Sequence, residues 1–114
     1  MNGKRFPAAL ALGLLLTIPL TALGQGKVTI TSPADGATLD ALDENRLVYD
    51  VEPGPRGDHV HVYVDNKEVG ILRKLKGSYL LESLDSGKRK LCVKVVNKAH
   101  VPIGVEKCVQ VTVK

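Results

Sequence analysis

The sequence predicts an all-β protein, built as an antiparallel sandwich of about seven short strands behind an N-terminal leader. Apolar and polar residues alternate with a period of two after the leader, and no helical pattern longer than one turn is present. Clusters of Pro, Asp, Asn and Gly recur roughly every 8 to 15 residues, a spacing typical of turns between short strands. A chain of 114 residues with this pattern forms one small domain rather than a multidomain enzyme.

Residues 1–24 have the features of an export signal. Lys4 and Arg5 give a positive start, residues 7–23 are uncharged, and residues 22–24 offer small side chains at a cleavage point. A retained membrane anchor is the second interpretation, because the uncharged stretch lies at the short end of the roughly 17–25 residues that span a bilayer. We expect a signal peptide at 1–24 and a single β-sandwich domain at 25–114, in the periplasm or secreted.

The expected strands follow in order, each bounded by turn residues. The first covers residues 28–31 and ends at the Pro/Asp/Gly turn of residues 32–36. The second covers residues 46–51, and the Pro- and Gly-rich segment 52–58 must be a loop because it cannot pair into a ladder. The remaining strands are expected at 59–64, 68–72, 78–84, 91–96 and 107–113.

Alternation also predicts which face of each strand is buried. In the third strand, Val60, Val62 and Val64 point to one side, and His59, His61 and Tyr63 point to the other. The valines are expected in the core. The inward residues expected from the neighbouring strands are Leu47, Tyr49, Val51, Leu91, Val93, Val95, Val109, Val111 and Val113.

Seven short strands in a domain of this length match an immunoglobulin-like (Ig-like) sandwich. The opening Val28-Thr29-Ile30-Thr31-Ser32-Pro33-Ala34-Asp35-Gly36-Ala37-Thr38-Leu39 and the later Leu84-Asp85-Ser86-Gly87 resemble the bacterial Ig-like and fibronectin-type-III-like domains of exported proteins. The chain is also similar to small exported bacterial proteins that combine such a sandwich with an early His-x-His strand and a late loop histidine. It lacks the core Trp and the Cys spacing of antibody domains, so the resemblance implies a fold and no particular function.

The two cysteines are expected to form a disulfide. If the last two strands form a hairpin about His100, Cys92 lies directly opposite Cys108 on the outer face, within disulfide reach. Export to an oxidising compartment permits the bond. Two free thiols, or thiolates that bind a metal, are the alternatives.

Three histidines form the sharpest candidate site. His59 and His61 lie two apart on one strand and so point the same way. In an Ig-like arrangement, the loop that carries His100 lies at the same end of the sandwich as His59. Three neutral imidazoles suit Cu(II) or Zn(II), with water or Asp58 completing the shell, and a thioether Cu(I) site is excluded because Met1 lies in the leader. Solvated histidines without a metal are the alternative.

No catalytic signature accompanies these residues, since neither a nucleophile elbow nor a phosphate-binding Gly motif is present. The segment His59-Val60-His61 is similar to the strand pair that ligates copper in copper superoxide dismutases. Those sites need at least one further histidine, and their second-metal and arginine motifs have no counterpart here. The sequence therefore predicts a non-enzymatic binding module with a copper or zinc site. The alternative is a structural or surface protein–protein interaction domain without a metal.

Charge is unevenly distributed along the chain, whose formal net charge is +4. Acidic residues dominate residues 31–68, and basic residues dominate from residue 69 onward. The candidate basic patch consists of Arg73, Lys74, Lys76, Lys88, Arg89 and Lys90. A single basic face would bind anionic lipid or polysaccharide, whereas lysines at strand edges also serve to discourage sheet pairing. Nucleic acid is a poor partner for an exported domain with so few aromatic residues.

Overall fold

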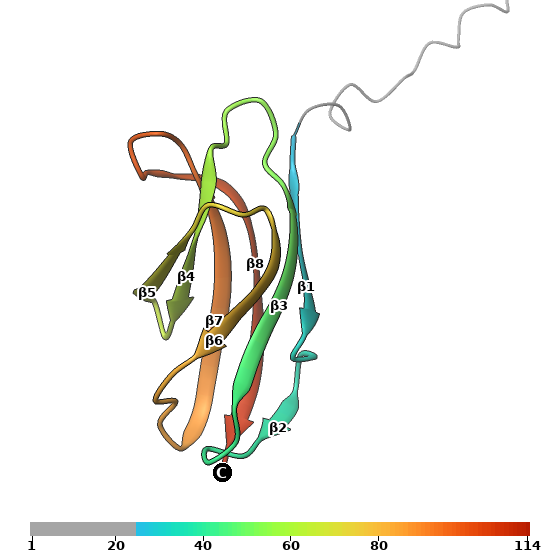
Figure 1. The fold of residues 1–114 in the computed structure, drawn as a ribbon, viewed down its shortest axis with the longest axis vertical. Helices are drawn as coiled ribbons and strands as arrows, with labels where there is room; N and C mark the ends of the chain where they lie inside the picture. Colours follow the sequence, from blue (N-terminus) through green and yellow to red (C-terminus); the bar gives the residue numbers. More distant parts are fainter. Residues whose placement is uncertain (1–24) are drawn as a thin grey trace, which may run out of the picture.

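The computed structural model describes residues 25–114, which form two sheets packed as a sandwich (Figure 1). The strands are β1 (Lys27–Ser32), β2 (Ala37–Leu39), β3 (Asn45–Glu52), β4 (His59–Val64), β5 (Lys67–Leu72), β6 (Lys76–Leu81), β7 (Gly87–Val96) and β8 (Pro102–Val113). One sheet has the order β1-β3-β6 and the other the order β2-β8-β7-β4-β5. The predicted all-β sandwich is confirmed, with eight strands rather than seven.

The predicted signal peptide, residues 1–24, lies outside the described residues. Among residues 25–114, none belongs to a helix long and apolar enough to cross a membrane.

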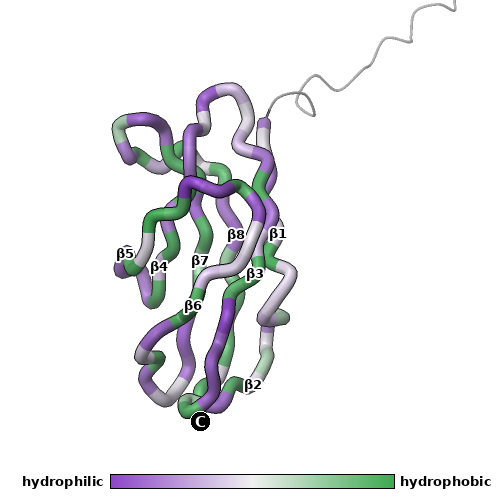
Figure 2. Tube along the Cα trace, viewed as in Figure 1, coloured by the Kyte–Doolittle hydropathy of each residue, from purple (hydrophilic) through white to green (hydrophobic). Residues whose placement is uncertain are grey.

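The core between the two sheets is formed by the side chains that the alternation predicts. Every inward residue expected from the second, third, sixth and seventh predicted strands, apart from the partly exposed Val64, is buried. Tyr49 is the largest of them, and its hydroxyl donates a hydrogen bond of 2.9 Å to the carbonyl of Lys74. Hydrophobic stretches run along β4 and β7 in Figure 2. The period-two pattern therefore positions β4 with one face against the core and one face free to carry a site.

A short strand, β2, is the element that alternation does not reveal. After β1 the chain turns at residues 33–36 and crosses to the other sheet, where β2 pairs parallel to β8. Asp35 Oδ1 accepts the N–H of Gln110 at 2.8 Å, and the N–H of Gly36, whose φ is +86°, donates to the Gln110 carbonyl at 2.6 Å. Three residues are too few to display a period of two, which is why the sequence does not predict β2.

Some strand boundaries differ from the prediction. The strand predicted at 78–84 ends at Leu81, because Ser83 adopts a φ of +55° that leaves the extended conformation. The last strand begins at Pro102 rather than at residue 107, and its register shifts near Gly104, whose φ is +90°. Pro102 and Gly104 therefore belong to the bulged start of β8 and not to the turn before it.

The β7–β8 hairpin has the predicted register from the Gly87–Val113 pair to the Lys94–Glu106 pair, before the shift near its tip. Cys92 lies opposite Cys108, with a Cα–Cα distance of 4.1 Å, and the two are joined by a disulfide. No free cysteine remains in residues 25–114. The hairpin therefore carries a covalent bridge in its middle and a turn, residues 97–101, at its tip.

Candidate metal centre

The first two histidines lie on the outer face of the five-stranded sheet. His59 pairs with Val96 of β7, and His61 lies between Lys94 of β7 and Ile71 of β5. Both histidines are nevertheless buried, with exposed fractions of 0% and 2%. These two histidines are therefore not solvated, because neighbouring groups cover this end of the face.

The turn at the tip of the β7–β8 hairpin brings in the third histidine. Asn97 organises the turn: its side-chain carbonyl accepts the N–H groups of Ala99 and Val101, and its backbone carbonyl accepts the N–H of His100 at 2.9 Å. His100 has a φ of +65°, a left-handed conformation that few non-Gly residues adopt. The turn thus holds His100 in an uncommon backbone conformation, with its ring against the rings of His59 and His61.

Three ring nitrogens, one from each histidine, lie close to one another. His59 Nε2 lies 3.2 Å from His61 Nε2 and 3.3 Å from His100 Nδ1, and the latter two atoms are 3.1 Å apart. In a tetrahedral site with Zn–N bonds of about 2.0–2.1 Å, neighbouring ligand nitrogens lie about 3.3–3.4 Å apart. The three nitrogens therefore form a triangle close to one face of such a tetrahedron.

Carboxylates lie behind both buried rings. His59 Nδ1 donates to Asp58 Oδ2 at 2.8 Å, and Asp58 Oδ2 also accepts from Arg73 Nη1 at 3.3 Å. Glu68 Oε1 lies 2.9 Å from His61 Nδ1, but this contact is not a well-directed hydrogen bond, and the buried Nδ1 has no aligned acceptor. Metal-binding histidines commonly present their second nitrogen to a carboxylate, which fixes the ring orientation. Asp58 meets this requirement fully and Glu68 meets it in part.

Electrostatics keep His61 in the neutral form, which is the form that binds metals. Burial lowers the pKa of His61; Glu68 opposes this effect, and the neighbouring His59 and His100 rings add to it. The hydrogen bond from His59 holds the pKa of Asp58 below its usual range, with smaller contributions from Arg73 and Lys98. At neutral pH the site therefore contains a neutral His61 imidazole and, next to His59, an ionised Asp58 carboxylate.

The proton positions leave too few N–H donors for the three nitrogens to hydrogen-bond to one another. Because a carboxylate can only accept, His59 Nδ1 carries a proton. In the neutral ring, Nε2 then has a lone pair. If His61 has the same tautomer, with the Nδ1 proton toward Glu68 Oε1 at 2.9 Å, two lone pairs face each other across 3.2 Å. His100 Nδ1–H can donate to only one of them at a time. A cation at the centre would satisfy all three nitrogens.

Asp58 does not complete the shell of ligands, contrary to one of the two options that the sequence suggested. Its Oδ2 contacts Nδ1 of His59, on the opposite side of the ring from the Nε2 that faces the triangle. Within residues 25–114, the group of His, Cys, Asp and Glu side chains that could share an ion here contains His59, His61 and His100 alone. Water remains the option for a fourth ligand.

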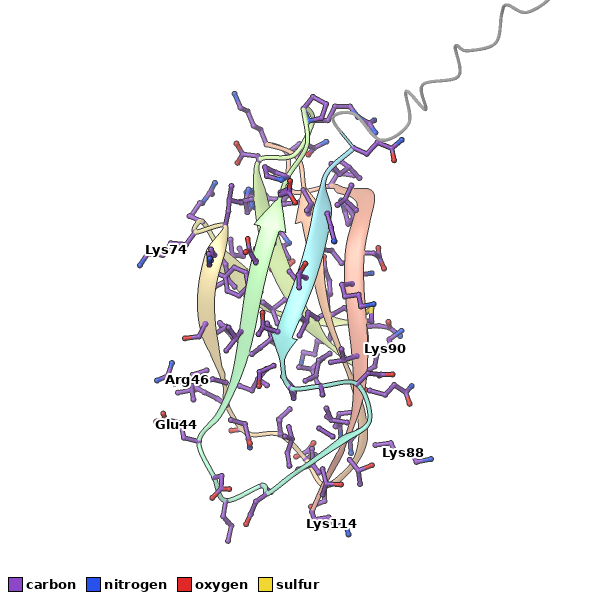
Figure 3. The ribbon with its side chains drawn as sticks, turned by 90° about the vertical axis from the view of Figure 1, so that its right-hand side faces the viewer. Glu44, Arg46, Lys74, Lys88, Lys90 and Lys114 are labelled. Carbon is purple, nitrogen blue, oxygen red and sulfur yellow. A yellow bond between two sulfur atoms is a disulfide. The ribbon has the colours of Figure 1, made fainter. Side chains whose placement is uncertain are left out.

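The predicted basic patch does not form a single face. Lys74 and Lys76 belong to the β5–β6 link and to β6, whereas Lys88 and Lys90 lie on β7 of the other sheet, and Figure 3 shows Lys74 on the opposite side of the molecule from Lys88 and Lys90. Three members have acidic neighbours: Arg73 contacts Asp58, Lys76 contacts Asp50, and Arg89 contacts Asp65. Clustering along the sequence therefore does not become clustering in space.

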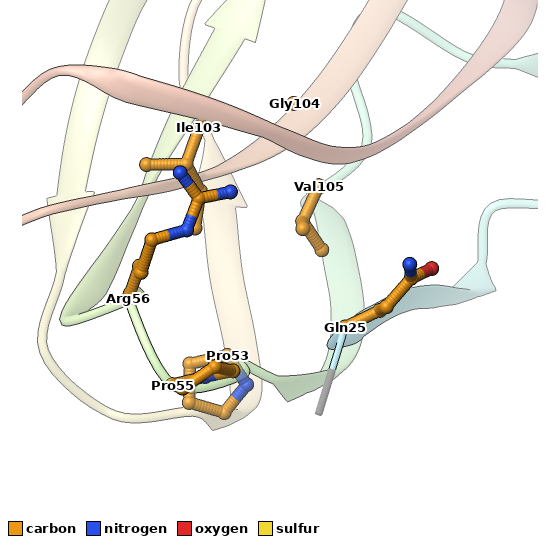
Figure 4. A pocket seen from close by; sticks show the side chains of 7 residues that line it. All are labelled: Gln25, Pro53, Pro55, Arg56, Ile103, Gly104 and Val105. Atoms are coloured by element: carbon orange, nitrogen blue, oxygen red, sulfur yellow. The ribbon is translucent and has the colours of Figure 1, made fainter. Parts of the chain in front are cut away.

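A separate cavity of about 280 Å³ lies between the β3–β4 loop and the start of β8. Pro53, Pro55 and Arg56 line one side, and Ile103 and Val105 line the other (Figure 4). None of the three histidines lines this cavity, so it is distinct from the candidate metal centre.

The sequence interpretation did not include three residues in the metal site: Glu68, Asn97, and Arg73, which it assigned to the basic patch. A signal for Glu68 was available, because a two-residue turn at Asp65-Asn66 places residue 68 opposite Tyr63, on the face that carries His61. The roles of Arg73 and Asn97 depend on how two connections fold over the sheet, and no local pattern predicts that.

Comparison of the sequence with protein families, and with individually curated proteins, finds no match. The structure is similar to the fibronectin(III)-like modules of Clostridium thermocellum CbhA, with a TM-score of 0.64 at 20% identity over 76% of this chain and 94% of that one. It is also similar to part of an engineered protein, with a TM-score of 0.55 at 20% identity over 79% of this chain and 20% of that one. At this level of identity the similarity concerns the fold alone. The chain therefore has a β-sandwich fold of the fibronectin-type-III and Ig-like kind.

Proposed function

We propose that this protein is an exported binding module that holds one transition-metal ion, Zn(II) or Cu(II), between His59 Nε2, His61 Nε2 and His100 Nδ1. The observation that supports it best is the triangle of three imidazole nitrogens, 3.1–3.3 Å apart, two of which belong to buried side chains. An arrangement of this kind costs free energy unless a cation or shared protons occupy it. Neutral imidazoles are suitable ligands for either metal.

The shape of the triangle distinguishes between the two metals. A square-planar Cu(II) site would place two of its three nitrogens opposite each other, about 4.0 Å apart, and the other pairs about 2.8 Å apart. Here all three distances are nearly equal, so no pair is opposed. The geometry favours Zn(II), whereas the general order of metal affinities favours Cu(II).

Export is part of the proposal. The Cys92–Cys108 disulfide and the fibronectin-type-III-like fold are both consistent with a domain outside the cytoplasm. The leader at 1–24 is the feature of the sequence that suggests a periplasmic or secreted location.

Isothermal titration of purified, untagged protein with Zn(II) and Cu(II) tests the proposal. We expect saturable binding of one ion per chain. His100→Asn is the informative variant, because Asn tolerates the left-handed backbone at this position and the turn should stay folded. We expect it to weaken metal binding by at least 10- to 100-fold. Loss of a residue that only contacts a ligand already has an effect of about this size, and loss of a ligand itself should have no smaller one. Unchanged affinity in His100→Asn would show that His100 is not a ligand, and the site would then be only the incidental pair of His59 and His61 on β4.

The competing hypothesis is a structural or protein–protein interaction domain without a metal. In its favour, edge strand β5 exposes Val69 and Ile71, with exposed fractions of 41% and 47%. Exposed apolar residues on an edge strand are common at interaction surfaces. Absence of saturable metal binding in the titration would favour this hypothesis.

A further inference from the structure

The candidate metal centre has three protein ligands, and the fourth coordination position is the question that the structure raises next. Both Asp58 and Glu68 contact Nδ1 atoms behind the rings, and within the described part of the chain no fourth His, Cys, Asp or Glu side chain joins the three histidines. Zn(II) and Co(II) take at least four ligands. The missing ligand must therefore come from another kind of group or from outside the protein.

The three nitrogens lie on one side of the position that an ion would occupy. Since their mutual distances match one triangular face of a tetrahedron, the remaining coordination direction points away from that face. The cluster also reaches the protein surface, because Lys98, Ala99 and His100 of the hairpin turn are all exposed. The arrangement thus resembles zinc sites that keep an open position, rather than closed structural sites with four protein ligands.

The local charges determine which ligands this position prefers. Three neutral imidazoles leave the full charge of a divalent ion uncompensated. Asp58 and Glu68 offset that charge, but Arg73 and Lys98 lie close to Asp58, and Lys94 is the cross-strand neighbour of His61. The centre with its metal therefore has a net positive charge, which favours an anionic ligand over a neutral one.

We propose that the metal-loaded protein binds a small anion as the fourth ligand of the ion held by His59, His61 and His100. This inference rests on the proposed function, since it requires the metal. The ligand class is a compact anionic donor, such as a carboxylate or an inorganic anion, which exchanges with metal-bound water.

The test uses Co(II) in place of Zn(II), because the visible absorption of Co(II) reports its coordination number and ligands. Purified, untagged protein is loaded with one equivalent of Co(II) and titrated with azide and, separately, with acetate. We expect a saturable change of the cobalt bands with a stoichiometry of one. Arg73→Gln should weaken azide binding about two- to threefold, because a positive charge near the site is removed. The matched control is Arg46→Gln, which removes an exposed arginine from the other sheet and should leave azide affinity unchanged.

A four-coordinate cobalt spectrum that does not respond to either anion would overturn the inference, because the chain would then supply the fourth ligand itself. Metal-dependent dimerisation in sedimentation velocity, with no response to azide, would overturn it too, since a second copy would occupy the position. If the protein gives no spectrum of bound cobalt at all, the result refutes the proposed function instead. The two failures are therefore distinguishable.

Discussion

Zinc should raise the thermal stability of this protein, and the size of the effect follows from where the ligands lie in the chain. His59 and His61 are on β4, whereas His100 lies 41 residues after His59, in the β7–β8 turn. The unfolded chain does not hold these groups together, so the metal binds the folded state preferentially. At a free zinc concentration of 100 times the dissociation constant, the gain in free energy of unfolding is about 2.7 kcal/mol.

For a domain of this size, 1 kcal/mol shifts the midpoint of unfolding by about 4–8 °C. The expected rise is therefore about 11–22 °C, reduced by any binding of zinc to the His59-Val60-His61 segment in the unfolded chain. Differential scanning calorimetry at several zinc concentrations measures it, with the midpoint rising as the logarithm of free zinc. Magnesium is the matched control ion, because it prefers oxygen ligands and should leave the midpoint unchanged.

His100→Asn separates this mechanism from general stabilisation by zinc. The variant keeps the strand pair and loses the ligand from the turn, so most of the zinc-dependent rise should disappear. An equal rise in His100→Asn and in the unaltered protein would refute the reasoning, because binding would then not depend on the folded arrangement. A saturable zinc titration without any rise would refute it as well.

Three further predictions concern the groups around the centre and the hairpin. Asp58→Asn should weaken zinc binding by about 10- to 100-fold in a competition titration, because the His59 ring loses its carboxylate acceptor. Glu68→Gln should weaken zinc binding less, since the contact between Glu68 and His61 is poorly directed. A larger effect of Glu68→Gln than of Asp58→Asn would contradict this assignment. Replacing Cys92 and Cys108 together by Ala should lower the free energy of unfolding by roughly 3 kcal/mol, as expected for a bridge between residues 16 apart; urea denaturation measures it, and an unchanged midpoint would show that the bridge does not constrain the unfolded chain. Asp65→Asn should lower the free energy of unfolding by about 1 kcal/mol at pH 7, because this half-exposed carboxylate accepts hydrogen bonds from the Lys90 N–H and from Arg89. These bonds hold the pKa of Asp65 below its ordinary value of 3.8, so its contribution is present above that pH and is lost as the pH falls through the lowered pKa of the folded protein; a difference between Asp65→Asn and the unaltered protein that persists at pH 2 would contradict this explanation.

Much of the fold could be predicted because the core depends on local patterns. Alternating valines define the inward face of β4 and β8, and the turn residues mark the connections between most strands. The same alternation, with a hairpin centred on His100, places Cys92 opposite Cys108. These predictions succeed because a period of two and a two-stranded register both depend on neighbouring residues alone.

The burial of His59 and His61 could not be predicted in the same way. Alternation places both rings on the outer face of the sheet, and that part of the prediction agrees with the register of β4. What covers them is the 97–101 turn and the carboxylates of Asp58 and Glu68, which arrive from three different connections or strands. A sequence pattern states which side a residue points to, but not what is folded over that side.

For the basic patch, the sequence suggested a single charged face that the structure does not have. Lys74 and Lys88 belong to one basic half of the sequence, but the chain crosses from one sheet to the other between β6 and β7, which separates them. Charge clusters along a chain of short strands predict a charged face only where the strands are neighbours in one sheet. Here β6 and β7 lie in different sheets.

The disulfide and the candidate metal centre lie at different positions along the β7–β8 hairpin, the disulfide in its middle and the centre at its tip. Cys92–Cys108 joins β7 and β8 midway along the pair, where the adjacent core residues are already buried. The turn that carries His100 lies beyond this bridge, is exposed, and is held chiefly by the hydrogen bonds of Asn97. A metal ion shared with β4 would fix this turn against the sheet, where few apolar contacts do so. Because the core and the bridge lie below the turn, the proposed ion would act on the tip of the hairpin alone. Metal binding as proposed would then be a local event on a pre-formed scaffold, the arrangement expected of a binding module rather than of a domain that needs zinc in order to fold.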